Sequence, residues 1–403
     1  MSGAVHPAPI GPAARRNIAL LGAFNFCNDF RVYAPVMVVY FAAVTGSFAL
    51  GTLVFSVAKI ASVLFEVPTG VFSDRIGRRL TLLLGQIASL VSIASYALGH
   101  GFAVLALGAA LEGLAFSLFS GNNDALLYDT LKAEGATDHF AEWHGRVSAL
   151  FQLALAISAA VAMLALYFHL TLRMLFVMSL LPQAIGIVFA LLLTEPPRTG
   201  AIPSNIFAHL REALAGFARN VRLRDLSLAS MLGFAIGEGK HMFHPAFFAL
   251  YWPSWALGLA GVLVHALGAL GFRLGGAAIR RFGAFPVLLG GSIGSALAGI
   301  GAIALPGLAS PAIVSLSSIL YGPSSVAQGM MQQRAFSDAQ RATMASLISL
   351  GGNLLFAGAV FGLGALADRI GARFALLTAE FLSIPILVLY WRLYRASRVE
   401  GRA

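Results

Sequence analysis

Cysteine and charge are what this sequence has least of. Cys27 is the single cysteine among 403 residues, which excludes an intrachain disulfide and any metal site built from several thiolates. Asp, Glu, Lys and Arg together make up only 11% of the chain, whereas soluble globular proteins contain about a quarter. With 58% hydrophobic residues and a mean hydropathy of +0.82, the chain is not expected to be a soluble globular protein.

The sequence also lacks the short signatures of several enzyme classes. Neither H-E-x-x-H nor G-x-S-x-G occurs, and there is no Walker loop to bind ATP. We therefore expect neither an enzyme nor a protein that uses ATP directly. No cofactor and no resident metal ion are expected either.

Long apolar runs make up most of the chain. Runs of roughly 18 or more residues recur along its whole length, and each is long enough to cross about 30 Å of hydrocarbon as a helix. They are continuous rather than alternating, which favours a helical bundle over a β-barrel. The first run extends to about Val44 without a convincing cleavage site, so we interpret it as an uncleaved span. About twelve spans are expected, near residues 17–44, 48–72, 80–99, 102–130, 145–169, 172–194, 224–250, 254–279, 284–305, 310–333, 341–366 and 372–395.

The basic residues predict the orientation in the membrane. Of the 27 Lys and Arg, 20 fall on the side of the N-terminus, four lie within spans, and three lie on the other side, namely Arg173, Arg369 and Arg373. The positive-inside rule then places both termini in the cytoplasm, as in a multi-pass protein of the cell inner (plasma) membrane. This topology explains the net charge of +10, so no nucleic-acid partner is expected.

The longest connection divides the chain into two halves. It covers residues 195–223, so the expected units are a six-span half at 1–194, a cytoplasmic linker, and a six-span half at 224–403. Within the linker, one helical face would carry Ile206, Leu210, Leu214, Phe217 and Val221. That pattern predicts an amphipathic helix on the inner leaflet.

One decapeptide recurs in the loops. GVFSDRIGRR (70–79) lies between spans 2 and 3, and GALADRIGAR (364–373) lies between spans 11 and 12 on the opposite side of the membrane. A weaker copy, GAAIRRFGAF (276–285), lies between spans 8 and 9. This arrangement indicates internal repeats, some of them inverted. In the first copy, we expect Gly70 to allow close helix approach and Gly77 to supply the turn.

The first copy resembles the signature loop of the major facilitator superfamily, G-x-x-x-D-R-x-G-R-R/K, and the matching residues are Gly70, Asp74, Arg75, Gly77, Arg78 and Arg79. The resemblance covers the whole chain and implies an all-α membrane protein. Its fold would have 12 transmembrane helices in two six-helix halves, built from inverted three-helix repeats. The resemblance also implies a secondary active transporter that works by alternating access.

The same resemblance assigns the loop to a gate. In the family, the Asp and Arg of this loop hold the cytoplasmic gate against the start of span 11. Asp74 and Arg75 are therefore expected to be gate residues rather than solute ligands, and Glu66 is expected to be a partner on the gate side. In the 276–285 copy, Arg280 stands in place of the Asp, which puts a second gate contact there in doubt.

The subfamily is not indicated. Proton-coupled drug exporters of this family usually carry an Arg in span 4 and a Gly-Pro pair in span 5. This chain has Ala109 near the first place, and its fifth span contains neither Gly nor Pro. These departures make a drug exporter less favoured without excluding it.

Polar and charged residues inside the spans are the candidates for solute binding and coupling, because a charge in lipid is costly and marks a cavity or a partner. In the family, spans 1, 4, 7 and 10 line the central cavity, and those four spans hold all of the candidates. They are Asn28, Asp29, Arg31, Glu112, Asn123, Asp124, Glu238, Lys240, His241, His244, Tyr321 and Gln328.

Several of these residues have two interpretations. Asp29 and Arg31 form either a solute-binding pair or a structural pair with Lys59 and Glu66, and we prefer binding because a buried ion pair is a costly way to stabilise a fold. Asp124 either lines the cavity or packs helix against helix. For proton coupling, which needs a buried carboxylate or His, we choose Asp29 and Glu238 first.

Span 7 gathers four candidates. Glu238 and Lys240 are two residues apart and cannot share a helical face, so each is expected to have a partner on another helix. His241 and His244, with His265 or the single cysteine, offer a soft-metal site as one alternative. Hydrogen bonding in the cavity, or a pH-sensitive role, is the simpler interpretation.

The charges inside the spans also favour one kind of solute. Four cations, Arg31, Lys59, Lys240 and Arg273, are nearly balanced by acidic neighbours. We therefore expect a monomer in the bilayer that moves a small anionic or zwitterionic organic solute together with protons. A proton-driven multidrug or toxic-compound exporter and a metal or metal-chelate transporter stay as alternatives. The sequence does not assign the solute, the direction of transport or the coupling ion.

Overall fold

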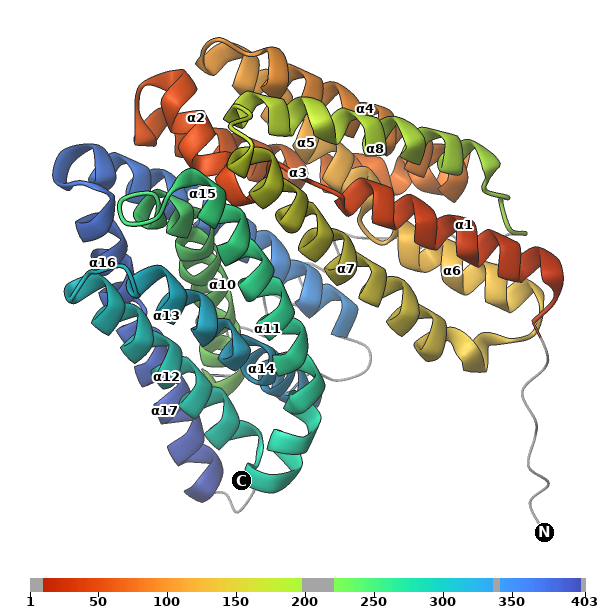
Figure 1. Cartoon of the computed structure of the whole chain (residues 1–403). Helices are drawn as coiled ribbons and strands as arrows, with labels where there is room; N and C mark the ends of the chain where they lie inside the picture. The colour runs from red at the N-terminus through yellow and green to blue at the C-terminus, as the bar shows by residue number, and fades with distance from the viewer. Residues whose placement is uncertain (1–9, 198–220, 336–340, 400–403) are drawn as a thin grey trace.

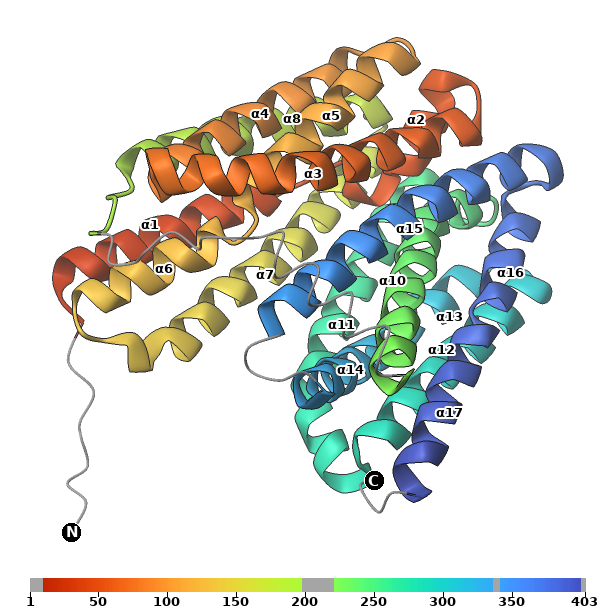
Figure 2. The same ribbon diagram turned by 180° about the vertical axis from the view of Figure 1, so that it is seen from behind.

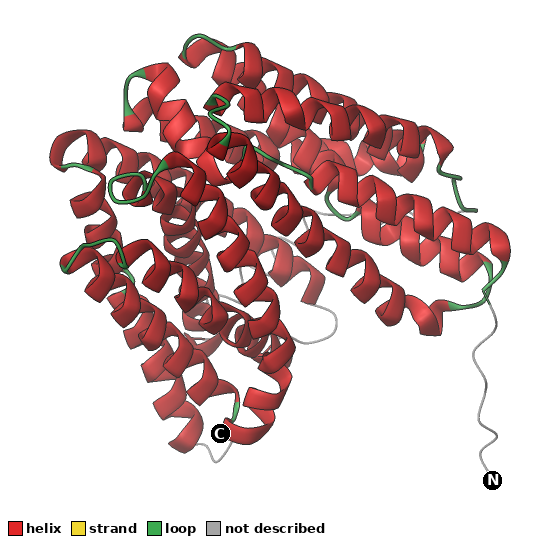
Figure 3. Cartoon of the chain, viewed as in Figure 1, coloured by secondary structure: helices red, strands yellow, loops and turns green. Residues whose placement is uncertain are grey.

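The computed structural model describes residues 10–197, 221–335 and 341–399, which form helices and short connections with no strand among them (Figure 3). Nine stretches of these residues are long and apolar enough to cross a membrane as helices. Large apolar side chains such as Leu64, Leu181 and Leu297 lie exposed on their outer faces, as expected of surfaces that contact lipid. Most of the predicted linker, with its expected amphipathic helix, lies outside the described residues.

Six spans form the N-terminal half. Two of them, spans 1 and 4, are interrupted, and the short helix η2 (Thr137–His139) precedes span 5. In chain order the spans are α1 (Pro12–Asp29) with η1 (Ala34–Val36) and α2 (Met37–Thr45), α3 (Phe48–Ile76), α4 (Arg78–Leu98), α5 (Phe102–Phe119) with α6 (Asn122–Ala133), α7 (Phe140–Tyr167), and α8 (Leu172–Leu192).

Six more spans form the C-terminal half, and here spans 10 and 12 are interrupted. In chain order they are α10 (Val221–Phe248), α11 (Ser254–Phe282), α12 (Ala284–Ala304), α13 (Ser310–Leu316) with η3 (Ser317–Leu320) and α14 (Tyr321–Ala335), α15 (Arg341–Ile370), and α16 (Ala372–Leu382) with α17 (Ile384–Val399). The prediction of an all-α membrane protein with twelve spans is confirmed.

The recurring decapeptide forms the same turn at all three of its places. Gly77, Gly283 and Gly371 each join two long helices, with φ values of 109°, 86° and 84°. Each of these N–H groups donates to the carbonyl four residues earlier, and the next helix begins at the following residue. Glycine alone adopts a positive φ freely, which explains why it recurs here. Gly77 therefore supplies the turn, as predicted.

We call the end of the molecule where α3 meets α4 the Gly77 end, and the end where α15 meets α16 the Gly371 end. At the Gly371 end, one apolar core contains side chains of both halves, among them Tyr33, Phe41, Phe243 and Phe356. The backbones also come close there, because a Cβ on Gly258 of α11 would overlap the carbonyl of Ala159 in α7.

At the Gly77 end, each half has a core of its own. One core joins α1, α4, α6 and α8 through residues such as Leu82 and Leu127. The other joins α10, α12, α14 and α17 through residues such as Leu288 and Tyr390. The two halves accordingly lie side by side near α2 and α15 and run apart toward the ends marked N and C (Figures 1 and 2).

Candidate functional site

Span 1 is interrupted at the residues that carry its charges. Its α-helix ends at Asp29 and helical structure resumes only at Ala34. Pro35 follows directly, and in a continuous helix its ring would clash with the carbonyl of Arg31, four residues earlier. The sequence around Arg31 therefore cannot continue as a regular α-helix.

Polar side chains of α8 bond the backbone groups at this interruption, and α4 supports them. Gln183 Nε2 donates to the carbonyls of Asn28 (2.9 Å) and Cys27 (3.4 Å), and the N–H of Val32 donates to Ser179 Oγ (3.0 Å). The Gln183 carbonyl oxygen Oε1 accepts in turn from Gln86 Nε2 at 2.8 Å. Irregular backbone at membrane depth needs such partners, because lipid offers none.

The interruption places a cation between two carboxylates. Arg31 Nη1 lies 3.7 Å from Glu112 Oε1, and Arg31 Nη2 lies 4.0 Å from Asp29 Oδ1. Tyr96 donates its hydroxyl to Glu112 Oε2 at 2.7 Å, and Asn28 Nδ2 donates to Asp29 Oδ1 at 3.3 Å. The predicted pairing of Asp29 with Arg31 is therefore present, and Glu112, rather than Lys59 or Glu66, completes it.

This cluster is only partly enclosed and only partly satisfied. The exposed fractions of the Arg31, Glu112 and Asp29 side chains are 29%, 26% and 16%. Asn28 Oδ1 is buried without a hydrogen-bond partner among the described residues. Together these groups offer a solute one cation, two carboxylates and a free amide acceptor.

Lys59 and Glu238 extend the polar region into the C-terminal half. Lys59 lies in α3, and its Nζ lies within 6.0 Å of the ring centres of Phe116 in the N-terminal half and of Phe234 and Phe356 in the C-terminal half. Glu112 and Glu238 lie one helical turn from Phe116 and Phe234, on the same helix faces. At 1.5 Å per residue, Lys59, Glu112 and Glu238 lie roughly 15 Å along their helices from the Gly371 end, about half the thickness of the hydrocarbon.

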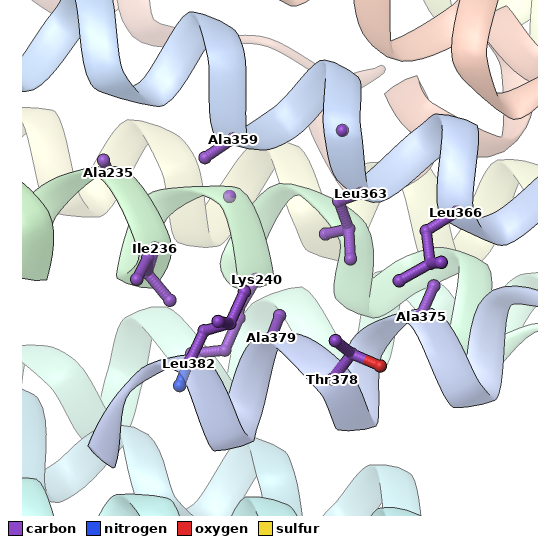
Figure 4. Close-up of a pocket in the computed structure, with 12 residues that line it drawn as sticks. Ala235, Ile236, Lys240, Ala359, Leu363, Leu366, Ala375, Thr378, Ala379 and Leu382 are labelled. Atoms are coloured by element: carbon purple, nitrogen blue, oxygen red, sulfur yellow. The ribbon is translucent and has the colours of Figure 1, made fainter. Parts of the chain in front are cut away.

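Lys240 points to a different partner. Its Nζ lies 2.8 Å from Glu380 Oε2 and 3.1 Å from Ser383 Oγ, where span 12 is interrupted. The prediction of a partner on another helix is confirmed for Lys240, whereas Glu238 makes no hydrogen bond or ion pair with the described residues. Figure 4 shows Lys240 beside an apolar recess of about 220 Å³, also lined by Leu363 and Leu382 and enclosed by α10, α15 and α16.

Glu380 is the buried charge that the sequence analysis missed. Only 3% of its side chain is exposed, and its carboxylate lies against Gly299 of α12. The signal was available, because Glu380 is the single acidic residue within predicted span 12 and intramembrane carboxylates are rarely incidental.

The histidines of span 7 lie side by side without forming a metal site. The rings of His241 and His244 are 6.4 Å apart, and His244 stacks on Phe248 at 5.6 Å. His244 Nε2 is buried and finds no hydrogen-bond partner within the described part of the chain. No group of three or more His, Cys, Asp or Glu suited to a metal ion occurs among the described residues.

Four candidates lie apart from the charged cluster or at its edge. Asp124 is exposed on α6 and lies 3.3 Å from His144 Nε2. Asn123 has a buried Oδ1 with no partner among the described residues, and Gln328 is half-buried in α14. Tyr321 is exposed, and its ring packs edge-on against Phe272.

The described contacts of the signature loop at the Gly77 end join it to helices of the N-terminal half. Asp74 lies 3.2 Å from Arg78 Nη1, which also donates to Ser73 Oγ and Asn122 Oδ1. Both oxygens of Glu195 accept from the first N–H groups of α4, at Arg78 (2.8 Å) and Arg79 (2.7 Å). These contacts hold the loop to α4, α6 and the end of α8.

The other gate candidates are Glu66, Arg75 and Gly70. Glu66 accepts from Ser120 Oγ at 2.8 Å, within the same half, and Arg75 is exposed. A Cβ at Gly70 would meet nothing within 4 Å, so the expected close helix approach at Gly70 does not occur in this conformation.

The copy at the Gly371 end forms contacts between the two halves. Asp368 accepts from Ser47 Oγ (2.5 Å) and from the N–H groups of Phe48 (2.7 Å) and Ala49 (2.9 Å). A Cβ on Gly364 would overlap the Thr52 hydroxyl and the Phe48 carbonyl. Asp368, from the C-terminal half, thus caps the N-terminus of α3, where a negative charge is favourable.

The chain matches one family profile and several solved structures. The Major Facilitator Superfamily profile matches residues 19–362. The nucleoside transporter NupG matches with a TM-score of 0.76 and 16% identity, over 94% of this chain and 99% of NupG. A bacterial homologue of the human lysosomal transporter Spinster, solved inward-facing and unoccupied, matches with a TM-score of 0.74 and 18% identity, over 95% and 97% of the two chains.

A third solved structure, the human organic anion transporter MFSD10 (TETRAN), matches with a TM-score of 0.63 and 18% identity, over 94% of this chain and 100% of MFSD10. No curated protein sequence matched the chain. At these identities the structural likeness shows the fold alone.

Proposed function

The chain belongs to the major facilitator superfamily, and from this premise we propose that it is a secondary active transporter for a small anionic or zwitterionic organic solute. The coarser part of this statement, a multi-pass membrane transporter, follows from the family and the helical fold. The solute class is inferred from the residues of the candidate site. The observation that carries it is the half-buried cluster of Asp29, Arg31 and Glu112 at the interruption of span 1.

The geometry of this cluster supports binding rather than a purely structural role. Charge-assisted hydrogen bonds are usually about 2.7–2.9 Å long, whereas Arg31 keeps 3.7 and 4.0 Å from its two carboxylates. A buried pair kept only for stability would be expected to close. The guanidinium therefore retains donors for a solute anion, and Asn28 Oδ1 retains an acceptor for a solute N–H or O–H group.

Alternating access is the proposed mode of transport, and the Gly77 end is the proposed cytoplasmic end. The basic residues support this orientation through the positive-inside rule. The shared core and the Asp368 contact support closure at the Gly371 end, and the separate cores support separation at the Gly77 end. The described conformation would then face inward, and Asp74 and Arg75 are proposed to belong to the gate at the Gly77 end.

Proton coupling is the second part of the proposal. Asp29 and Glu238 are proposed to carry the proton because both are partly enclosed and lie in different halves. Replacing both, as Asp29→Asn with Glu238→Gln, is expected to abolish proton movement while leaving the protein folded. Fluorescence of a pH dye inside proteoliposomes measures this, and undiminished pH-driven flux in the double variant would overturn the assignment.

The solute class is tested with the same proteoliposomes. A proton gradient is imposed and small organic anions, zwitterions, lipophilic cations and divalent metals are added in turn. Movement driven by anions or zwitterions, lost in Arg31→Gln and kept in the control Arg173→Gln, is the expected result. Movement driven only by lipophilic cations would replace the proposal with a multidrug exporter. Movement driven only by metals would direct attention to His241 and His244.

A further inference from the structure

Lys59 stands among three phenylalanine rings at the level of the charged cluster. Its Nζ lies 4.9 Å from the ring centre of Phe116, 5.8 Å from that of Phe356 and 6.0 Å from that of Phe234. Phe116 belongs to the N-terminal half, whereas Phe234 and Phe356 belong to α10 and α15 of the C-terminal half. Lys59 is therefore a cation at the junction of the two halves.

The ammonium group has no oxygen partner in the described structure. An ammonium carries three N–H donors and no acceptor. Lys59 makes no hydrogen bond or ion pair with any described residue, whereas Lys240, also within the membrane, makes both. Aromatic faces stabilise a cation electrostatically but accept its hydrogen bonds poorly. Lys59 thus leaves its N–H donors unused among the described residues, at a depth where unused donors are costly.

We infer that Lys59 binds the anionic group of a zwitterionic solute. This inference rests on the proposed transport function and names the solute class for it. A carboxylate or phosphate oxygen would supply the hydrogen-bond acceptors that the ring cage lacks. The rings of Phe116, Phe234 and Phe356 would then pack around the apolar part next to that group.

Glu238, in the C-terminal half, is the residue that would bind the cationic group of the zwitterion. It lies one helical turn after Phe234 on α10, so it shares a helix face with a ring that packs around Lys59, and it forms no ion pair or hydrogen bond with the described residues. Glu112, the other carboxylate near Lys59, is already held by Tyr96 and Arg31. A zwitterion would therefore place its anion on Lys59 and its cation on Glu238. Lys59 belongs to one half and Glu238 to the other, so the solute would join the two halves.

The test compares acids with their uncharged analogues. The probes are amino acids, small carboxylates and phosphate monoesters, each paired with its amide or neutral ester, added to wild type, Lys59→Gln and Lys59→Arg. Uptake into proteoliposomes gives KM, and the thermal midpoint in detergent reports binding independently of transport. Lys132→Gln, the same replacement on α6, is the matched control.

We expect Lys59→Gln to raise KM for the transported zwitterion by roughly tenfold or more, as for loss of a hydrogen bond to a charged group. KM for the amide or ester should change less than about twofold, and Lys59→Arg should restore most of the affinity. Equal losses for the acid and its neutral analogue would overturn the inference, as would a wild type that none of the acids stabilises.

Failure of the transport proposal can be distinguished from failure of the Lys59 inference. If acids stabilise wild type but no solute is transported, the transport proposal fails. The difference in thermal stabilisation between wild type and Lys59→Gln then still decides whether Lys59 is the anion site. If chloride alone produces the whole stabilisation, the site binds an inorganic anion and the solute assignment is wrong.

Discussion

Arg31 contacts two carboxylates, and neither contact is short. Glu112 is oriented by the Tyr96 hydroxyl at 2.7 Å, so it stays 3.7 Å from Arg31 instead of closing on it. Asp29 is oriented by Asn28 in the same way. The two carboxylates are thus oriented by Tyr96 and Asn28 rather than by Arg31. Hydrogen-bond donors of Arg31 therefore stay available to a solute.

A change at Glu112 tests this arrangement at the scale of one side chain. Glu112→Gln keeps an acceptor for Tyr96 but removes one of the two negative charges around Arg31. We expect the initial rate of solute uptake to fall roughly tenfold or more, since interactions with a charged group are worth about 1.5–3 kcal/mol. The thermal midpoint should change little.

The control is Glu142→Gln, which removes an exposed carboxylate that pairs with Arg146 on α7, outside the cluster. An uptake rate in Glu112→Gln equal to that of Glu142→Gln would show that the Glu112 charge plays no part in transport.

The interrupted helix of span 1 depends on side chains of other elements. Pro35 prevents a continuous helix, and the carbonyls of Cys27 and Asn28 each accept a hydrogen bond from Gln183 of α8. Each also accepts one from span 1 itself, from the Phe30 N–H and from Arg31 Nε. Gln86 and Ser89 of α4 hold Gln183 in place through its Oε1. Three helices therefore determine the backbone that carries Asp29 and Arg31.

Gln183→Leu removes this support at the scale of the element. The carbonyls of Cys27 and Asn28 would each lose one of two hydrogen bonds, and Gln86 Nε2 would keep only the Gln183 main-chain carbonyl. The buried Ser89 hydroxyl would lose its acceptor, at about 1–3 kcal/mol for an unsatisfied group. We expect a fall in unfolding free energy of about 2 kcal/mol or more, seen as a lower thermal midpoint in detergent. Ser95→Ala, which removes only an exposed bond to Val91 in the same helix, should change it by less than about 0.5 kcal/mol. Equal midpoints for the two variants would contradict this account of the break.

Across the whole molecule, the described contacts of two copies of one motif differ. At the Gly371 end, Asp368 caps α3 across the two halves and Gly364 packs tightly against that helix. At the Gly77 end, Asp74 pairs with Arg78 and Gly70 faces open space. A fold in which one end shares a core and the other does not is suited to alternation between the two copies.

Asp368→Ala is expected to loosen the Gly371 end. Ser56, buried between α3 and α15, serves as a reporter when it is replaced by Cys in a chain whose Cys27 is replaced by Ser. Loss of a charged cap with three hydrogen bonds should speed labelling of that cysteine by a membrane-impermeant maleimide by roughly tenfold.

The matched control is Asp138→Ala, which removes an exposed carboxylate from η2 in the N-terminal half. Labelling at the same rate in Asp368→Ala and in the parent chain would show that Asp368 does not hold this end closed.

The family, the twelve spans and the glycine turns follow from the sequence by itself, for a physical reason. Lipid requires continuous apolar helices, and a positive φ between two helices requires glycine, so both features appear as local patterns. Asp29 and Arg31 could also be selected from the sequence, because two charges in an apolar run need an explanation.

The tertiary structure decided which charges meet. Nothing local in the sequence assigns Glu112 to Arg31, Glu380 to Lys240, or Asp368 to the start of α3, because each pair joins distant segments. It also decided which end shares a core, since both decapeptide copies are compatible with either state. Partners and conformation depend on how helices pack in three dimensions, and helical periodicity carries no record of that packing.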